Sequence, residues 1–255
     1  MSKIKNWIFL FFIFLIMYLP IFYLIYYSFS SDNNMAKFGH FSLKHYSNLL
    51  SDHRLIGIVI NTVLIALISA TIATIIGTLG ALYVNGLTRK WVKSSILTLN
   101  NILMVSPDVI IGASFLILYS AFKLPLGFWS VLISHVAFSV PIVVLMVLPK
   151  LKELKQSYID AAYDLGATGP QVLSQVILPF ISSGILAGFF MALTYSLDDF
   201  AVTFFVTGNG FETLSVEIYA LARRGISLEI NALTGIIFLV ISIAIVFLLF
   251  HSSKK

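Results

Sequence analysis

Residues 149–179 read PKLKELKQSYIDAAYDLGATGPQVLSQVILP, a largely polar stretch between two long apolar runs. Its apolar residues recur at spacings of three and four, as on an amphipathic helix; they are Leu151, Leu154, Tyr158, Ala161 or Ala162, and Leu165. Gly166 is placed to end that helix, because glycine tolerates the left-handed conformation common at helix C-termini. Gly169-Pro170 suits the start of a second helix, which Pro179 is expected to close. The stretch therefore predicts a helix-turn-helix that lies outside a bilayer.

On both sides of this stretch the chain is strongly apolar. Of its 255 residues 59% are hydrophobic and 11% charged, and the mean hydropathy is +0.98. A soluble domain does not have this composition, so most of the chain is expected to lie in a lipid bilayer. The net charge is +5, but the basic residues are scattered between apolar runs, so no nucleic-acid partner is expected. The chain has no cysteine, which excludes disulfides and thiolate metal sites, and we predict no metal site and no cofactor.

Six apolar runs are long enough to cross about 30 Å of hydrocarbon as helices. They are residues 6–29, 56–84, 95–121, 128–148, 178–207 and 232–250. The first run follows Lys3 and Lys5 and has no cleavage pattern after it, so we interpret it as an uncleaved anchor. The sequence thus predicts an all-α, polytopic membrane protein in which residues 1–255 form a single transmembrane domain.

The basic residues predict an orientation. With the N-terminus in the cytoplasm, ten of the sixteen Lys and Arg residues fall on the cytoplasmic side and six outside, as the positive-inside rule requires. Both termini and the 149–179 stretch are then cytoplasmic. In the outer loop, apolar residues at helical spacing predict a short helix near residues 42–51.

Small residues recur along two of the runs. Gly184 and Gly188 stand four apart in the fifth run, and the second run contains Ala66, Ala70, Ala73, Gly77 and Ala81. Small side chains at this spacing let helix backbones approach closely in lipid. We therefore predict close helix packing at these positions.

Three carboxylates lie inside the apolar runs. Asp108 is in the third, and Asp198 and Asp199 interrupt the stretch YSLDDFAVTFF, residues 195–205, in the fifth. A carboxylate at the bilayer centre costs about 2.5–3.5 kcal/mol, and none of the six runs contains a Lys or Arg to neutralise it. A cationic cargo such as a protonated polyamine would supply the missing charge. Tyr195 adds an aromatic face and Ser196 a hydroxyl to this predicted cation path.

Other roles for these polar residues stay open. Adjacent helical residues point about 100° apart, so Asp198 and Asp199 cannot both face one groove. One of them would then bind a neighbouring subunit, Arg223 or the backbone where the helix ends. A proline precedes Asp108, whose alternative role is to satisfy backbone groups freed by that proline. His135 is expected to bond to a neighbouring helix, with a proton relay as the alternative.

The 149–179 stretch resembles the EAA loop of ABC importer permeases, whose pattern is E-A-A, three residues, G, nine residues, then I-x-L-P. The matching residues are Asp160-Ala161-Ala162, Gly166 and Val176-Ile177-Leu178-Pro179, with Asp160 in place of Glu and Val176 in place of Ile. The stretches VSPDVIIGASFL, residues 105–116, and SLDDFAVTFFVTG, residues 196–208, are similar to the spermidine/putrescine permeases of that family. The resemblance covers effectively the whole chain.

This resemblance implies a type I ABC importer permease fold with six transmembrane helices in a bacterial inner or plasma membrane. It implies that the loop docks on a separate ATPase; the residues concerned are Asp160, Ala161, Ala162, Gly166, Leu178 and Pro179. The implied partners are two copies of that ATPase, a second, non-identical permease and an extracellular or periplasmic polyamine-binding protein. The sequence lacks the phosphate-binding pattern G-x-x-x-x-G-K-[ST], so we expect ATP hydrolysis by another subunit and no enzyme activity here.

Two other functions stay open. One is an ABC permease for a different small solute, such as iron, an amino acid or a sugar acid. The other is a proton-coupled secondary transporter in which Asp108, His135 and Asp198 relay protons. Uptake that survives collapse of the proton gradient and stops on ATP depletion favours the importer.

Overall fold

The computed structural model describes residues 2–33, 35–224 and 228–252. These residues are largely helical and, apart from one isolated bridge between Ser30 and Phe41, form no β-structure. The helices are α1 (Ser2–Ser28), α2 (Lys44–Ser51), α3 (His53–Gly86), α4 (Lys90–Val105), α5 (Asp108–Ala121), α6 (Phe128–Glu153), α7 (Gln156–Asp164), α8 (Gly169–Val172), the π-helical turn η1 (Leu173–Ile177), α9 (Leu178–Asp198), α10 (Ala201–Val206), α11 (Leu214–Arg224) and α12 (Leu228–Ser252). The predicted all-α class is confirmed.

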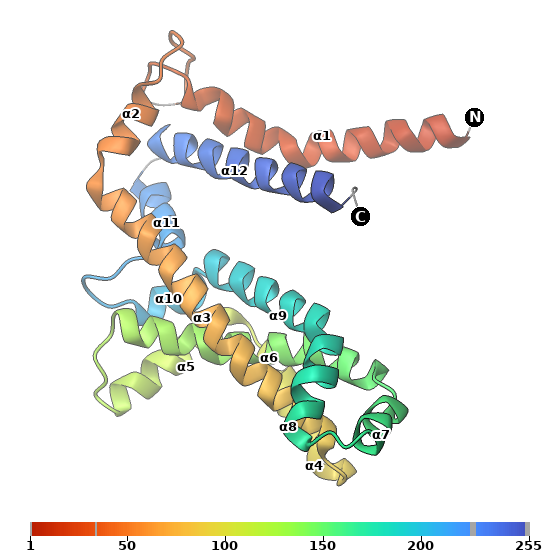
Figure 1. Ribbon diagram of the computed structural model, residues 1–255. Helices are drawn as coiled ribbons and strands as arrows, with labels where there is room; N and C mark the ends of the chain where they lie inside the picture. The colour runs from red at the N-terminus through yellow and green to blue at the C-terminus, as the bar shows by residue number, and fades with distance from the viewer. Residues whose placement is uncertain (1, 34, 225–227, 253–255) are drawn as a thin grey trace. The chain divides into compact units, whose positions relative to one another are not determined.

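The chain divides into two compact units, of which the first comprises residues 1–57 and 217–255. In this unit α1 and α12 pack against each other along much of their length (Figure 1). They run antiparallel, so the start of α1 and the end of α12 lie toward the same end of the pair (Figure 1). A chain with both termini on one side of a membrane needs this arrangement, although the orientation itself stays a prediction.

The helix expected near residues 42–51 of the outer loop is present as α2. The Tyr46 hydroxyl lies 2.8 Å from the Ser28 hydroxyl at the end of α1. The Asn48 amide donates a hydrogen bond of 3.2 Å to Glu229 at the start of α12. These contacts attach α2 to both long helices of the first unit.

The second unit, residues 58–216, is built around α6 and α9, which make its most extensive helix contact. Glycines allow its closest approaches, because a Cβ atom on Gly77 of α3 would lie 2.6 Å from Val143 Cβ on α6. A Cβ on Gly188 of α9 would lie 3.2 Å from Val143 Cγ1. Val143 is fully buried. The predicted close packing of the small residues is confirmed at these two glycines.

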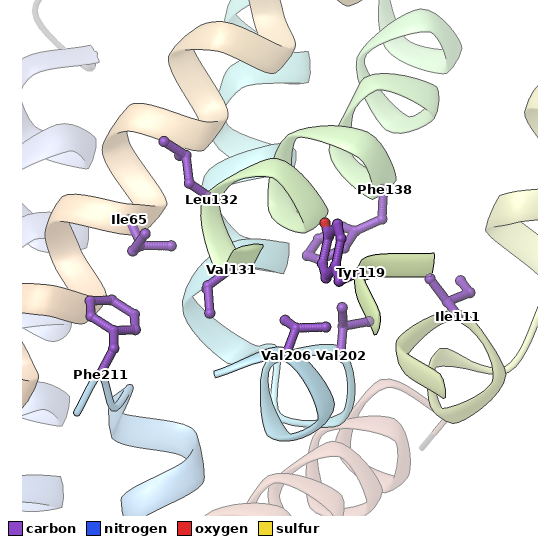
Figure 2. Close-up of a cluster of buried hydrophobic side chains, with 9 residues drawn as sticks. All are labelled: Ile65, Ile111, Tyr119, Val131, Leu132, Phe138, Val202, Val206 and Phe211. Atoms are coloured by element: carbon purple, nitrogen blue, oxygen red, sulfur yellow. The ribbon is translucent and has the colours of Figure 1, made fainter. Parts of the chain in front are cut away.

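A second buried cluster in this unit brings together short helices that come from distant parts of the sequence. Its residues are Ile65, Ile111, Tyr119, Val131, Leu132, Phe138, Val202, Val206 and Phe211, and their side chains come from α3, α5, α6, α10 and the loop after α10 (Figure 2). The helices α5 and α10 approach each other closely at a glycine. A Cβ on Gly112 of α5 would lie 2.8 Å from the Phe205 ring of α10. This packing fixes the two short helices that border the candidate site.

Four helical stretches among the described residues are long and apolar enough to span a bilayer. They are Lys5–Ser28, His53–Gly86, Phe128–Glu153 and Gly169–Asp198. The pair α4 and α5 passes the same test together, with a bend of 105° at the break between the two helices. The sixth expected span, residues 232–250, falls in α12, of which Leu228–Val240 is a shorter apolar helix. The count of six therefore stays a prediction, as does the single domain.

The expected disturbance of the third apolar run at Pro107 is present, because the run consists of two separate helices. The helix stops at Ser106, whose backbone is extended with ψ of 138°, and restarts at Asp108. The break coincides with Pro107, which lacks an N–H group and disfavours the helical conformation of the residue before it. The proline therefore divides the third apolar run into α4 and α5.

The first half of the 149–179 stretch is partly as predicted. Gly166 has φ of +85° and ends α7; its N–H donates to the Tyr163 carbonyl (2.9 Å), and the Ala167 N–H donates to the Ala162 carbonyl (3.0 Å). This is the bonding of a helix that ends in a left-handed residue. The prediction of one helix that carries the apolar residues from Leu151 to Leu165 is wrong. Leu151 lies in the last turn of α6, which ends at Glu153, and α7 begins only at Gln156.

The second half of the stretch begins as predicted and ends differently. The helix starts at Gly169, and the Thr168 N–H donates to the Gln171 side chain (2.7 Å). Pro179 does not close it, because α8, η1 and α9 follow one another without interruption from Gly169 to Asp198. Pro179 lies in the first turn of α9, just after the π-helical turn, whose wider winding accommodates the ring.

Candidate functional site

A cavity of about 350 Å³ lies where two broken helical segments of the second unit meet. It is lined by Asp108, Thr194, Tyr195, Asp198, Asp199, Phe200 and Ala201. One border is the start of α5, and the other is the break between α9 and α10. The structure thus brings the three predicted carboxylates and Tyr195 to one place, although Asp108 is far from the others in sequence.

Asp108 is the first residue of α5, and its side chain is exposed. A carboxylate in the first turn is favoured by the partial positive charge of a helix N-terminus. Within the described ranges Asp108 makes no hydrogen bond or ion pair, so the structure gives no support to its alternative role of satisfying freed backbone groups. Asp108 also borders a smaller pocket of about 40 Å³, together with Phe138 and Tyr195. Its carboxylate is available to a ligand in the cavity.

Asp198 is the last residue of α9 and is also exposed. It has no hydrogen-bond or ion-pair partner in the part of the chain that the structure describes. Tyr195 lies one turn earlier, and its ring centroid is 5.8 Å from that of Phe138 on α6. The cavity therefore presents a second unpartnered carboxylate beside an aromatic ring.

Asp199 is bound to fixed partners, although it also borders the cavity. Its side chain is 6% exposed and accepts hydrogen bonds from the Val202 N–H (3.2 Å), the Thr203 N–H (2.8 Å) and the Thr203 hydroxyl (2.7 Å). His135 Nε2 lies 3.5 Å from the same carboxylate. Of the alternatives left open for the adjacent pair, Asp199 shows binding to the backbone at the helix end, where α10 begins.

Ser196 is buried and does not border the cavity. Its hydroxyl lies 2.6 Å from His135 Nδ1 and 3.1 Å from the hydroxyl of Ser69 on α3. On the other side of the imidazole, Nε2 lies 2.8 Å from the Thr203 hydroxyl. The prediction that His135 bonds to a neighbouring helix is confirmed, and the structure gives Ser196 a place in this network; its role in the path stays a prediction.

Ser69 and Thr203 are members of this network that sequence reasoning missed. One signal was available for Thr203, because Asp is a favoured residue at helix starts and a new helix after Asp199 would place Thr203 in its first turn. No comparable signal marks Ser69. It contacts Ser196 only through the packing of α3 against α9.

The six residues expected to couple to an ATPase lie in two groups on the polar side of the second unit. Asp160, Ala161 and Gly166 are exposed, and Gln156 donates a hydrogen bond of 3.0 Å to Asp160. Ala162 and Leu178 are half-buried, while Pro179 is exposed. Since α7 packs against α8 and η1, the two groups lie on neighbouring elements. The surface they share is accessible to a partner.

Comparison with known families gives one match, which covers residues 73–255. The matching family is described as "Binding-protein-dependent transport system inner membrane component". The match includes all the elements from the middle of α3 onward, and therefore the cavity and the EAA-like loop.

Several proteins of known function are similar along most of the chain. The spermidine/putrescine transport system permease protein PotC of Haemophilus influenzae is 36% identical over 94% of this chain and 93% of its own length. PotC of Escherichia coli K12 is 38% identical over 90% of this chain and 86% of its own. The putrescine permease PotI of the same strain is 33% identical over 88% and 82%.

Solved structures show the same fold at lower identity. A chain of a bacterial ABC transporter that imports the acidic polysaccharide alginate matches with a TM-score of 0.74, covering 99% of this chain and 94% of its own, at 19% identity. A second structure of a bacterial alginate transporter, in complex with its pentasaccharide-bound periplasmic protein, matches with a TM-score of 0.72 at 19% identity. At these identities the likeness concerns the fold alone.

Proposed function

This chain belongs to the family of binding-protein-dependent transport system inner membrane components, and we propose that it is the permease subunit of an ATP-driven importer of polyamines. The cargo would be spermidine or putrescine. The observation that carries this proposal is the cavity bordered by Asp108 and Asp198, two carboxylates with no partner among the residues that the structure describes.

The chemistry of the cavity supports a cation rather than an anion. None of the residues that line it is Lys or Arg, so a sulfate, a phosphate or an anionic sugar would meet repulsion. A protonated amine loses its hydration only where carboxylates or aromatic faces replace the water. Asp108 and Asp198 offer carboxylates, and Tyr195 and Phe200 offer aromatic faces. The relatives PotC and PotI are named for the transport of spermidine and putrescine, which supports the same substrate class.

We infer that transport follows alternating access between two permease chains. In one state the cavity opens to a binding protein outside, and in the other to the cytoplasm. A second, non-identical permease would complete the path, and two copies of an ATPase would drive the exchange. The polyamine is held weakly in passing, because capture belongs to the binding protein and the permease must release its cargo.

The ATPase would dock on the exposed part of α7 and on the start of α9. Asp160, Ala161 and Gly166 are accessible there, which supports this assignment. Docking of the ATPase there would place residues 149–179 and both termini in the cytoplasm, on the side that the positive-inside rule favours. The remainder of the chain would then lie in the inner or plasma membrane of a bacterium.

The test is uptake of labelled spermidine and putrescine by cells that carry the complete transporter with Asp108→Asn or Asp198→Asn. Each substitution removes a charge that would contact an ammonium group, and we expect initial rates to fall about tenfold or more. Glu153→Gln is the control, since it removes a carboxylate whose exposed ion pair with Lys150 (2.7 Å) contributes little. Wild-type rates in both Asp variants, with the control also unchanged, would refute the cation path.

A further inference from the structure

A single buried histidine bonds to both sides of the break between α9 and α10. His135 lies on α6 with its side chain 1% exposed. Its Nδ1 bonds to Ser196, in the last turn of α9, and its Nε2 bonds to Thr203, in α10. Asp198 lies between these two attachment points in sequence.

The break itself is not a proline or glycine kink. Asp199 has an extended backbone with ψ of 119°, and the helix resumes at Ala201. Side chains bind the backbone on both sides of the break. The Asp199 carboxylate accepts from two N–H groups of α10, and the Ser215 hydroxyl donates to the Leu197 carbonyl of α9 (3.3 Å). The geometry of the break therefore depends on side-chain contacts.

The donors and acceptors around His135 allow it to bond to α9 and α10 at the same time. Thr203 gives its hydroxyl proton to Asp199 (2.7 Å), so its oxygen accepts from the Nε2–H of His135. His135 Nε2 also lies 3.5 Å from the Asp199 carboxylate. Because the imidazole ring is planar and rigid, its bonds to Ser196 and Thr203 hold the end of α9 and the start of α10 in one relative orientation.

We propose that His135 is a positioning residue for transport, which aims the Asp198 carboxylate into the cavity by fixing the break on either side of it. The inference rests on the proposed function, because it takes Asp198 as a contact of the cargo. Asp198 has no bond of its own within the described residues, so the direction of its side chain follows the backbone that His135 holds.

The test is a double-mutant cycle in the complete transporter, with the initial rate of labelled spermidine uptake as the readout. We expect His135→Leu to lower the rate about tenfold, the effect of losing hydrogen bonds to two buried hydroxyl groups. In the Asp198→Asn background the same substitution should change the rate by less than about twofold, because an asparagine at 198 no longer depends on its aim. If His135 served stability alone, the fold losses of His135→Leu and Asp198→Asn would instead multiply in the double variant.

Two further variants separate the bonds. Asparagine at position 135 places its amide near the position of Nδ1, and glutamine places its amide near that of Nε2, so each retains one of the two attachments. We expect both His135→Asn and His135→Gln to import at rates between those of wild type and His135→Leu. The matched control is Ser134→Ala, on the same helix and equally buried, whose partner Tyr119 keeps a second bond to the Ser130 carbonyl (3.2 Å).

The outcomes distinguish this inference from the proposed function. Wild-type uptake by Asp198→Asn refutes the cation path and removes the premise. A defective Asp198→Asn with normal uptake by His135→Leu, or with losses that multiply, overturns only the role of His135. If none of the three His135 variants assembles with the ATPase while Ser134→Ala does, the histidine serves folding, and the inference fails on that result too.

Discussion

Asp198 and Asp199 are consecutive carboxylates with opposite surroundings. Asp199 is buried and accepts hydrogen bonds from two N–H groups and a hydroxyl, which offset the cost of removing its charge from water. Asp198 is exposed to the cavity and has no such bonds within the described part of the chain. The difference arises because the helix ends between them. The first is therefore free to meet a cation, while the second holds the local structure.

Gly166 gives a prediction at the scale of one residue. Its φ of +85° suits glycine, and an added Cβ would meet no atom within 4 Å, so backbone conformation rather than space limits what can replace it. Valine in a left-handed conformation costs roughly 1–2 kcal/mol, whereas asparagine tolerates it. We expect Gly166→Val to lose most of the ATPase that copurifies with the permease and Gly166→Asn to retain at least half.

Copurification of the ATPase with each variant, normalised to the amount of permease, measures this difference. Equal losses in the two variants would mean that the ATPase excludes any side chain at position 166, and the conformational explanation would be wrong.

Single residues were predictable from sequence where their role is local. The end of α7 at Gly166 follows from the residue itself, and so does the break at Pro107. The contact of Asp199 with His135 does not, because the buried His135 comes from α6 and lies 64 positions earlier in the chain. The sequence therefore identified the carboxylates of the candidate site, and the structure showed which of them is already bound.

At the scale of elements, the two broken spans have different causes. Pro107 divides α4 from α5 by covalent constraint, and a pattern of residues is sufficient to predict it. The break after α9 contains neither proline nor glycine and is held by contacts with α6. Pro179 shows the converse, since a proline in the first turn of α9 is compatible with a continuous helix. Proline alone is therefore not a sufficient sign of a break, since Pro141 and Pro149 also lie inside the continuous helix α6.

The packing of α3 against α6 gives a prediction at this scale. In Gly77→Ala the new Cβ would lie 2.6 Å from Val143 Cβ, so the helices must separate, at a cost of about 1–3 kcal/mol. Gly80→Ala, one turn further along α3, is the matched control because its nearest atom is 3.8 Å away. Alanine also favours a helix over glycine, so the control should be neutral or slightly stabilising.

Thermal denaturation of the purified permease in detergent checks this expectation. Gly77→Ala should denature at a lower temperature than wild type, whereas Gly80→Ala should not. Equal denaturation temperatures for Gly77→Ala and Gly80→Ala would show that α3 and α6 are not in close contact in the bilayer protein.

At the scale of the whole molecule, composition was sufficient for the class. A chain with a mean hydropathy of +0.98 and few charges must bury its backbone hydrogen bonds in lipid as helices, and the structure is helical throughout most of its described length. The division into two compact units was not predictable, because it depends on contacts between the first and last parts of the chain. No local pattern records which distant helices pair.

The source of energy is the prediction that concerns the whole transporter. Since the chain belongs to a family of ABC importer components, spermidine uptake should stop when ATP is depleted and continue when a protonophore collapses the proton gradient, provided that ATP is maintained. Initial uptake rates in energy-starved cells, with and without a fermentable sugar and the protonophore, separate the two conditions. Uptake that follows the proton gradient at constant ATP would favour the secondary transporter instead.

The continuous helical stretch from Gly169 to Asp198 joins the EAA-like loop to the cavity without an intervening loop. Its contour length is about 45 Å, since its 30 residues rise about 1.5 Å each. A displacement imposed on its first turns would therefore reach Asp198 through one run of backbone hydrogen bonds.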